Sequence, residues 1–213
     1  SVGARAAAES ARNAAREAAA QASWVVESVT GTAHRAGPYG HPISEGRTRE
    51  PDTGMAWGSL IHALLEHAMR GPARDRAHLE RLANWLTLDN PELRRVVPEA
   101  LDTIERVTAS EFWQRATAAD QRLVEVPFAV KIEVGDGPPK ILHGVIDLAF
   151  RTSAGWELVD YKTDQADLPH LKARYGDQIR AYARQWADLT KSPIPYAGLY
   201  SVRADQLSDH LQS

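Results

Sequence analysis

Residues 156–163 read WELVDYKT, a short and otherwise apolar run that carries Asp160 and Lys162. An aspartate is poorly suited to the interior of a strand, and the same misfit recurs at Asp147 in the preceding apolar run GVIDLAF. Side chains alternate between the two faces of a strand, so Asp160 and Lys162 should share one face while Tyr161 points to the other. The two runs therefore predict neighbouring strands that place ionisable groups on one face of a sheet.

A turn-like segment, 152–155, joins these two runs. If the turn is centred on Ser153 and Ala154, Asp147 lies opposite Asp160, and side chains opposed in this way approach to about 5 Å at Cβ, where like charges are destabilising. A divalent cation between them would reverse the sign of that interaction, because hard cations prefer carboxylate oxygen. Alternatively, a connection one residue longer breaks the pairing, or the acids are ordinary polar residues near strand ends whose charges are satisfied by neighbours.

The sequence on either side alternates helical and strand-like patterns. The run GSLIHALLEHAMR has the spacing of a helix with one buried face, and residues 123–134 alternate apolar and polar side chains as a half-buried strand does. Pro98 should kink or end a helix. The order predicts an α/β fold with the core α-β-β-β-α-β, a mixed central sheet and a helical insertion. The predicted helices are 58–70, 75–88, 91–107, a short one after Ser110, and 171–190, and the predicted strands are 123–134, 141–151, 156–163 and 197–202.

The N-terminal part of the chain has a different composition. Residues 1–22 contain eleven alanines, which favours a solvated helix or a linker, and Glu9 and Glu17 argue against an acid-poor targeting peptide. Ser1 is not an initiator methionine, so we expect an excised domain or a processed product. The expected division is an alanine-rich segment over 1–22, an irregular lead-in over 23–54, and one domain over 55–213 with its helical insertion at about 73–120.

Composition excludes several classes of protein. The 213 residues are 43% hydrophobic and 25% charged, which is the globular average and excludes collagen-like and low-complexity chains. No apolar run is long enough to span a bilayer, so no membrane association is expected. The formal charge of −3 requires any nucleic-acid surface to be local. The chain has no cysteine, which excludes cysteine-held iron–sulfur clusters, thiolate zinc sites and cysteine nucleophiles, so a metal would be bound through oxygen and imidazole.

Two helices carry further candidate residues. His62 and Glu66 are four residues apart and share a helix face, where they could either ligate a divalent ion or form a partly exposed polar pair. Gln178 and Tyr182 are spaced in the same way on the later helix, where the bland interpretation is a polar edge next to a core tyrosine. That helix also has a local basic excess, which could face phosphates or solvent.

Four of these segments together resemble a known family. GSLIHALLE, GVIDLAF, WELVDYKTD and QIRAY are similar, in order, to the motifs G-x-x-x-H-x-x-L-E, G-x-x-D, D-x-K and Q-x-x-x-Y of the RecB-like branch of the PD-(D/E)XK nuclease superfamily. The nearest resemblance is to the C-terminal nuclease domain of AddA-type helicase-nucleases, over about residues 55–205. Ile146 stands where the superfamily's name has proline. The resemblance implies a restriction-endonuclease-like core with a mixed central sheet.

The resemblance also implies roles for individual residues. Lys162 would be the catalytic lysine, acting with Asp160 and Asp147. The implied metal ligands are His62, Asp147, Asp160 and the backbone carbonyl of Tyr161; Gln178 and Tyr182 would support the site and contact DNA, with Glu66 as a less certain helper. The implied cofactor is Mg²⁺, with Mn²⁺ as a substitute, and no iron–sulfur cluster.

The implied function is metal-dependent hydrolysis of DNA phosphodiester bonds, with single-stranded DNA as an exonuclease substrate, in double-strand break repair and recombination. The implied partners are a helicase motor on the same full-length chain and an AddB-like protein, in the bacterial cytoplasm. Two alternatives are a catalytically inactive nuclease-fold module for DNA binding or docking to a partner, and a different metal hydrolase built on the His62–Glu66 helix. The second leaves the lysine beside Asp160 unexplained.

Overall fold

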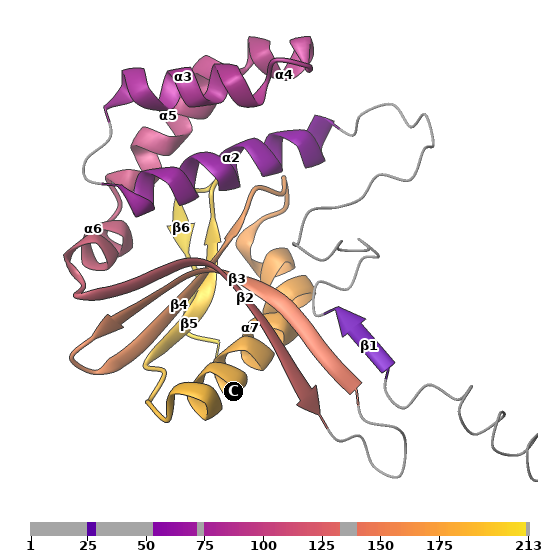
Figure 1. Cartoon of the computed structure of the whole chain (residues 1–213), viewed down its shortest axis with the longest axis vertical. Helices are drawn as coiled ribbons and strands as arrows, with labels where there is room; N and C mark the ends of the chain where they lie inside the picture. The colour runs from indigo at the N-terminus through magenta and orange to yellow at the C-terminus, as the bar shows by residue number, and fades with distance from the viewer. Residues whose placement is uncertain (1–24, 29–52, 72–74, 133–139, 212–213) are drawn as a thin grey trace, which may run out of the picture. The chain divides into compact units, whose positions relative to one another are not determined.

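The computed structural model describes residues 25–28, 53–71, 75–132 and 140–211 (Figure 1). The chain divides into two units, of which one comprises Ser1–Ala33 with Ala129–Gly144 and the other comprises His34–Phe128 with Val145–Ser213. The predicted alanine-rich helix or linker over 1–22 lies outside the described residues. All the predicted site residues belong to the larger unit.

The smaller unit contains a strand that the sequence did not predict. β1 (Val25–Ser28) runs parallel to the start of β3, with Val25 opposite Lys140 and Ser28 opposite His143. The expectation of an irregular segment over 23–54 is therefore wrong at these four residues. A strand this short has too few positions to show an alternating pattern, and its partner is more than a hundred residues away in the chain.

The helices of the larger unit begin and end close to the predicted positions. The predicted helix over 91–107 is two helices that meet at Val96, with Pro98 in the first turn of the second, where proline is tolerated. Asp75 and Asn90 cap the helices that follow them by accepting backbone N–H groups at 2.8 and 3.0 Å. The helices are α2 (Thr53–Arg70), α3 (Arg76–Leu86), α4 (Pro91–Arg95), α5 (Val97–Thr108), α6 (Glu111–Ala118) and α7 (Leu168–Thr190).

The strands form one mixed sheet with the order β1-β3-β4-β5-β6, and β2 also pairs with β3. β3 and β4 are antiparallel, with Leu148 opposite Val159 and Thr152 opposite Gly155, which is the register predicted for a turn centred on Ser153 and Ala154. β4 and β5 are parallel, as expected for strands connected through a helix. The strands are β2 (Gln121–Ile132), β3 (Lys140–Thr152), β4 (Gly155–Lys162), β5 (Tyr196–Ser201) and the short, unpredicted β6 (Gln206–Leu207).

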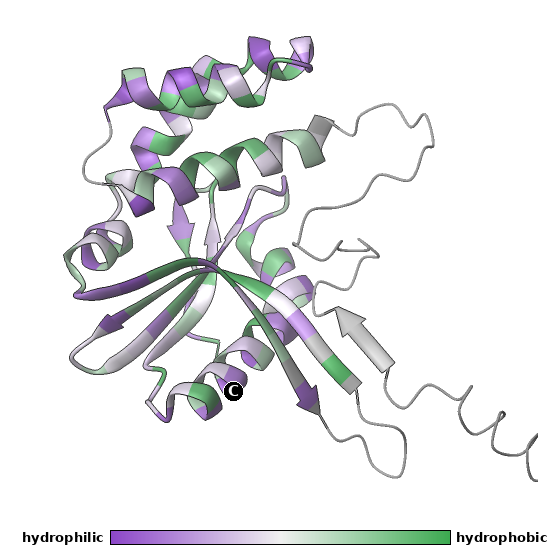
Figure 2. Ribbon diagram, in the orientation of Figure 1, coloured by the Kyte–Doolittle hydropathy of each residue, from purple (hydrophilic) through white to green (hydrophobic). Residues whose placement is uncertain are grey.

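In the larger unit, helices pack against both faces of the sheet, because side chains alternate between the two faces along each strand. One sheet face contributes Phe150, Val159, Tyr161 and Tyr200 to a core that includes buried residues of α2, α3, α5 and α6. The opposite face meets α7, where the rings of Trp156 and Trp186 are 5.4 Å apart. Figure 2 shows the matching mixture of hydrophobic and hydrophilic residues along these helices. The predicted stripe on α2 is confirmed, with Leu60, Leu64, Leu65 and Met69 buried and Ala68 packed against the core.

This arrangement confirms the predicted mixed α/β class and the order of one helix, three strands, one helix and one strand. The intervening helices α3 to α6 lie within the expected insertion. In the part of the chain that the structure describes, none of the helices combines the length and the apolar character needed to traverse a lipid bilayer.

One glycine fixes the turn of the β3–β4 hairpin. Gly155 has φ of +136°, a conformation that L-amino acids rarely adopt, and a Cβ atom there would collide with the carbonyl oxygen of Pro193. That carbonyl accepts the N–H of Trp156 at 2.9 Å, so the close approach is part of the fold.

We expect Gly155→Ala to lower the free energy of unfolding by more than about 2 kcal/mol, because strain and collision act together. Chemical denaturation monitored by tryptophan fluorescence measures the change, with Ser153→Ala in the same exposed turn as the control. Equal stability of Gly155→Ala and the parent chain would contradict this account of the turn.

Candidate active site

The site is built where β3 and β4 stop pairing. The ladder of paired residues ends at Leu148 and Val159, and the next residues along the two strands are Asp147 and Asp160, which are both buried. Beyond that point the Asp147 side chain replaces the backbone as the hydrogen-bond acceptor, because its Oδ2 accepts the Tyr161 N–H at 2.6 Å. The predicted register is confirmed, and it brings two carboxylates to one place in the interior.

Lys162 partly balances these two charges. Its Nζ lies 2.6 Å from Asp160 Oδ2, as expected for residues i and i+2 on one strand face, and it also lies 4.2 Å from the centroid of the Tyr175 ring on α7. Burial alone would lower the pKa of Lys162, but the charges of Asp160 and Asp147 outweigh it and raise that pKa above its usual value. Lys162 is therefore a fixed cation at neutral pH.

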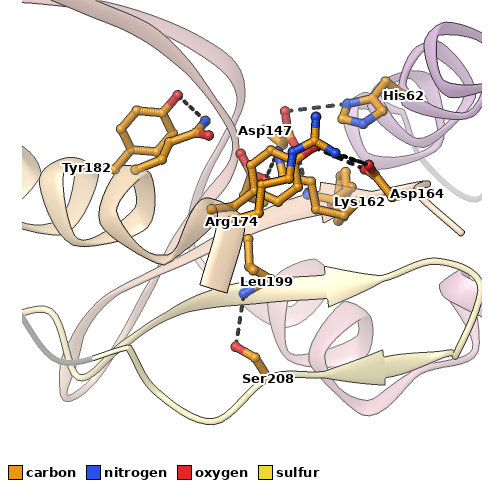
Figure 3. Close-up of polar contacts among 12 residues, drawn as sticks. His62, Asp147, Lys162, Asp164, Arg174, Tyr182, Leu199 and Ser208 are labelled. Carbon is orange, nitrogen blue, oxygen red and sulfur yellow. Dashed lines mark hydrogen bonds and ion pairs between the residues drawn. The ribbon is translucent and has the colours of Figure 1, made fainter. Parts of the chain in front are cut away.

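His62 reaches the acids from α2, one helical turn beyond Gly58. A Cβ at Gly58 would lie 2.9 Å from Thr163 Oγ1, so the glycine lets α2 approach the residue that follows Lys162. His62 Nδ1 lies 3.5 Å from Asp147 Oδ1. Burial lowers the pKa of His62, but the charges and hydrogen bonds of the surrounding acids prevail and raise it to about 10. Figure 3 shows the His62 ring directed toward the Asp147 carboxylate.

Glu125 is a member of the site that sequence reasoning missed. It belongs to β2, where the alternating pattern assigned it to the polar face, but its φ is +51°. A left-handed residue interrupts the alternation of a strand, and residues in such sparsely populated conformations cluster at active sites. Glu125 Oε1 lies 3.9 Å from His62 Nδ1. Glutamate at a positive φ leaves no signal in a hydropathy pattern.

The donor atoms of this site suit a divalent cation. Single ligand atoms of His62, Glu125 and Asp147 all lie within 4.8 Å of one another. Carboxylate oxygen and imidazole nitrogen are ligands for Mg²⁺ and Mn²⁺. The acids that raise the pKa of His62 attract cations in general, and a divalent ion bound there would have to take the place of the imidazole proton, because histidine ligates a metal in its neutral form. These three residues therefore fit a metal, and Glu125 joins two of the predicted ligands, His62 and Asp147, while the predicted ligand Asp160 lies outside this group.

Asp160 bears the largest electrostatic penalty in the site. Burial raises the pKa of its carboxyl, as does the charge of Asp147, and although Lys162 opposes them the result is a pKa of about 6. For Asp147, burial is outweighed by His62, Lys162 and the Tyr161 N–H, so its pKa is lowered. The two adjacent carboxyls are thus unequal, and Asp160 is the one whose charged form is disfavoured.

The sequence predicts four further site residues around this centre: Gln178, Tyr182, Glu66 and Tyr161. Gln178 Nε2 donates to Tyr182 OH at 2.7 Å in the interior. Burial raises the pKa of Tyr182, and the charges of Asp160 and Asp147 add to that effect. Glu66 forms an ion pair of 2.8 Å with Arg70. The pKa of Glu125 is raised chiefly by burial, and the charges of Asp147 and Glu66 add to that effect. The Tyr161 ring points to the opposite sheet face as predicted, and the ligand role of its carbonyl stays a prediction.

Comparison with known proteins identifies the family. The chain matches the PD-(D/E)XK nuclease superfamily over residues 8–208 and belongs to it. Nucleases of this superfamily use divalent metals, in agreement with the donor set described above.

Curated relatives include an ATP-dependent helicase/nuclease subunit from Bacillus licheniformis, 27% identical over 164 residues, and its counterpart from Levilactobacillus brevis, 29% identical over 170 residues. These alignments cover 67% and 70% of this chain but 13% of each relative, so the chain spans about an eighth of their length. The crystal structure of SSO0001, with 14% identity, a TM-score of 0.33, and coverage of 72% of this chain and 75% of that one, is too distant to add to the argument.

The raised pKa of Asp160 predicts a pH-dependent gain in stability on its removal. A carboxyl with a raised folded-state pKa binds its proton more tightly in the folded protein, so its contribution is favourable at acidic pH and is lost as the pH rises from about 3.8 to about 6. In a chelating buffer at pH 7.5, Asp160→Asn should increase the free energy of unfolding by about 1–3 kcal/mol. The increase should shrink at pH 4.5.

Denaturation curves at the two pH values test this expectation. Asp188→Asn, which removes the same charge from an exposed position of α7, is the control and should change stability little at either pH. A loss of stability in Asp160→Asn at pH 7.5 would show that the ion pair with Lys162 outweighs the penalty of burial.

Proposed function

We propose that the chain is a divalent-metal-dependent deoxyribonuclease that hydrolyses phosphodiester bonds in single-stranded DNA. The observation that carries the proposal is the placement of Asp147, Asp160 and Lys162 around the end of the β3–β4 ladder, with His62 facing Asp147 at 3.5 Å. Membership of the nuclease superfamily supports the reaction class.

We assign the metal to Mg²⁺, with Mn²⁺ as a substitute, held by His62, Asp147 and Asp160 together with Glu125 and the carbonyl of Tyr161. A bound divalent ion supplies activation of water and neutralisation of charge on the phosphate. The protein contributes a rigid, buried set of oxygen ligands, because the Asp147 carboxylate is fixed by the Tyr161 N–H and the side chain of Asp160 is held by Lys162.

Lys162 acts as a cation in this proposal. Because its pKa is raised, it carries a proton at neutral pH, so it can donate hydrogen bonds to an attacking water or to the phosphate oxygens but does not remove a proton. Contact with the Tyr175 ring restricts the position of the ammonium group, and this restriction lowers the cost of ordering it in the transition state.

Gln178 and Tyr182 position the site from α7. Their mutual hydrogen bond is buried, and the Tyr182 ring packs at 86° against Phe128 of β2, with ring centroids 4.9 Å apart. We assign to them support of the acids and contact with DNA, and to Glu66 an auxiliary electrostatic role.

The wider context is part of the proposal. We assign residues 55–213 to a nuclease domain with a helical insertion and the segments 1–22 and 23–54 to its lead-in. In the full-length protein this domain would receive DNA from a helicase motor on the same chain, act with an AddB-like protein in double-strand break repair and recombination, and work in the bacterial cytoplasm. The names of the curated relatives, which are ATP-dependent helicase/nuclease subunits, support the helicase motor in this context.

Cleavage assays test the reaction. With a fluorescent single-stranded oligonucleotide and Mg²⁺, the chain should release short products, and Lys162→Ala should lower the rate at least about 100-fold because a fixed charge is removed from the transition state. Asp160→Ala should be equally or more impaired. The exposed Lys191→Ala, just after α7, serves as the control and should cut at the parent rate. Equal rates for the parent and Lys162→Ala would refute the assignment.

Metal binding provides a separate test. Isothermal titration with Mn²⁺ should give one or more binding events that Asp147→Asn abolishes and Glu125→Gln weakens about 10–100-fold, because each removes an oxygen ligand charge. Glu80→Gln, an exposed position on α3, should bind as the parent does. Binding of Mn²⁺ that is indifferent to Asp147 would instead favour a catalytically inactive module for DNA binding or docking.

A further inference from the structure

A second feature of the larger unit is a groove of about 1220 Å³ beside the site. Its walls are the beginning of α2, parts of α4 and α5, and the segments that follow β4 and β5. This volume exceeds the usual range for a small-molecule pocket, roughly 300–1,000 Å³, and suits an extended ligand. Thr163, the residue directly after Lys162, is part of the lining, so the groove begins where the catalytic lysine is held.

The groove carries positive charge that can attract an anion, because most of its acidic groups are already paired with arginines. Three of its acidic groups are neutralised by arginines: Glu92 by Arg95 at 2.9 Å, Asp102 by Arg76 at 2.6 Å and Asp164 by Arg174 at 3.3 Å. Glu99 is the remaining acid in the wall. The ion pairs therefore remove most of the repulsion that the acids would exert on a phosphate chain.

Two arginines of the lining are held differently. Arg106 donates to the carbonyl oxygen of Val202 at 3.1 Å, and Arg203 donates to that of Gln165 at 2.8 Å. A backbone carbonyl fixes the position of a guanidinium group without neutralising its charge, and the group keeps further N–H donors. Arg106 and Arg203 are both exposed. Their guanidinium groups are held in fixed positions from which they can bind phosphate oxygens.

The same lining also contains apolar side chains. Met55 is 50% exposed, and Trp57 is partly exposed while it also packs against the core. An aromatic ring anchored in this way offers a surface on which a nucleobase can stack, a contact that tolerates any base. The combination of arginines with an aromatic platform is typical of grooves that bind single strands.

A set of ring contacts connects the groove to the catalytic centre. The guanidinium of Arg174, a groove residue, lies 5.1 Å from the centroid of the Tyr175 ring, and Lys162 Nζ lies 4.2 Å from the same centroid. Figure 3 shows Arg174, Asp164 and Lys162 gathered together. A strand with one phosphate at Lys162 therefore has its neighbouring nucleotides within reach of the groove.

We propose that this groove binds the segment of single-stranded DNA that adjoins the phosphate being cleaved, with Arg106 and Arg203 on its phosphates and Trp57 stacked on a base. The inference rests on the proposed function for the identity of the adjoining site. A duplex is excluded as the preferred occupant because its bases are stacked on one another and do not offer their faces to a side chain.

The test is equilibrium binding of the 213-residue chain to a fluorescein-labelled oligothymidylate, followed by anisotropy in chelating buffer so that no cleavage occurs. Trp57→Ala should raise Kd at least about fivefold. Arg106→Ala and Arg203→Ala should each reduce the slope of log K against log salt by about 0.7, the value for one phosphate contact on a single strand. Trp57→Leu, which retains apolar packing, separates loss of the ring from loss of folding and should bind as weakly as Trp57→Ala.

Matched controls lie on α3. Trp85→Ala removes a tryptophan that is 66% exposed, and Arg81→Ala removes an exposed arginine, both outside the groove lining, so both variants should bind as the parent does. Unchanged Kd and salt slope in Trp57→Leu and Arg203→Ala would overturn the inference, and so would equal competition by a duplex of the same length.

The two proposals can fail separately. If the chain cuts DNA but the groove variants bind as the parent does, the groove assignment is wrong and the proposed reaction stands. If the chain binds oligothymidylate through the groove but cuts nothing with Mg²⁺ or Mn²⁺, the groove assignment stands and the proposed reaction is wrong.

Discussion

The interaction on which the site depends is the hydrogen bond from the Tyr161 N–H to the carboxylate of Asp147. It replaces a backbone pairing where the β3–β4 ladder ends, and it fixes one buried carboxylate next to another at Asp160. Two adjacent buried acids are unfavourable unless positive charge is provided. The ammonium of Lys162 and the imidazole of His62 provide part of it, and the raised pKa of Asp160 shows that the balance is incomplete. The fold therefore keeps, next to these two acids, a place to which cations are attracted.

Much of this centre could be predicted because it rests on local rules. Alternation along WELVDYKT placed Asp160 and Lys162 together, and the length of the 152–155 turn fixed the register that aligns Asp147 with Asp160. Glu125 could not be found in this way, since the alternating pattern assumes an extended backbone at every residue and Glu125 has φ of +51°. The strands β1 and β6 were missed because four and two residues are too few to show a period.

The groove could not be predicted for a different reason. Its lining comes from segments separated by up to about 150 residues, and none of Trp57, Arg106 or Arg203 belongs to a recognisable motif. Distinguishing Arg106 and Arg203 from the paired arginines requires knowing that backbone carbonyls hold them. The helices predicted as an insertion therefore do more than enlarge the core, because α4 and α5 form one wall of this groove.

The hairpin of β3 and β4 is held unequally at its two ends. At the turn, Gly155 allows Trp156 to bond the Pro193 carbonyl, and the close approach leaves no space for movement. At the other end the Asp147 side chain bonds the Tyr161 N–H in place of a backbone pairing, while β4 stays paired with β5 as far as Lys162 and Ser201. The two acids are therefore placed in different ways. Asp160 is carried by the backbone of a strand that is still paired on its other side, whereas the Asp147 carboxylate is held by its own hydrogen bond.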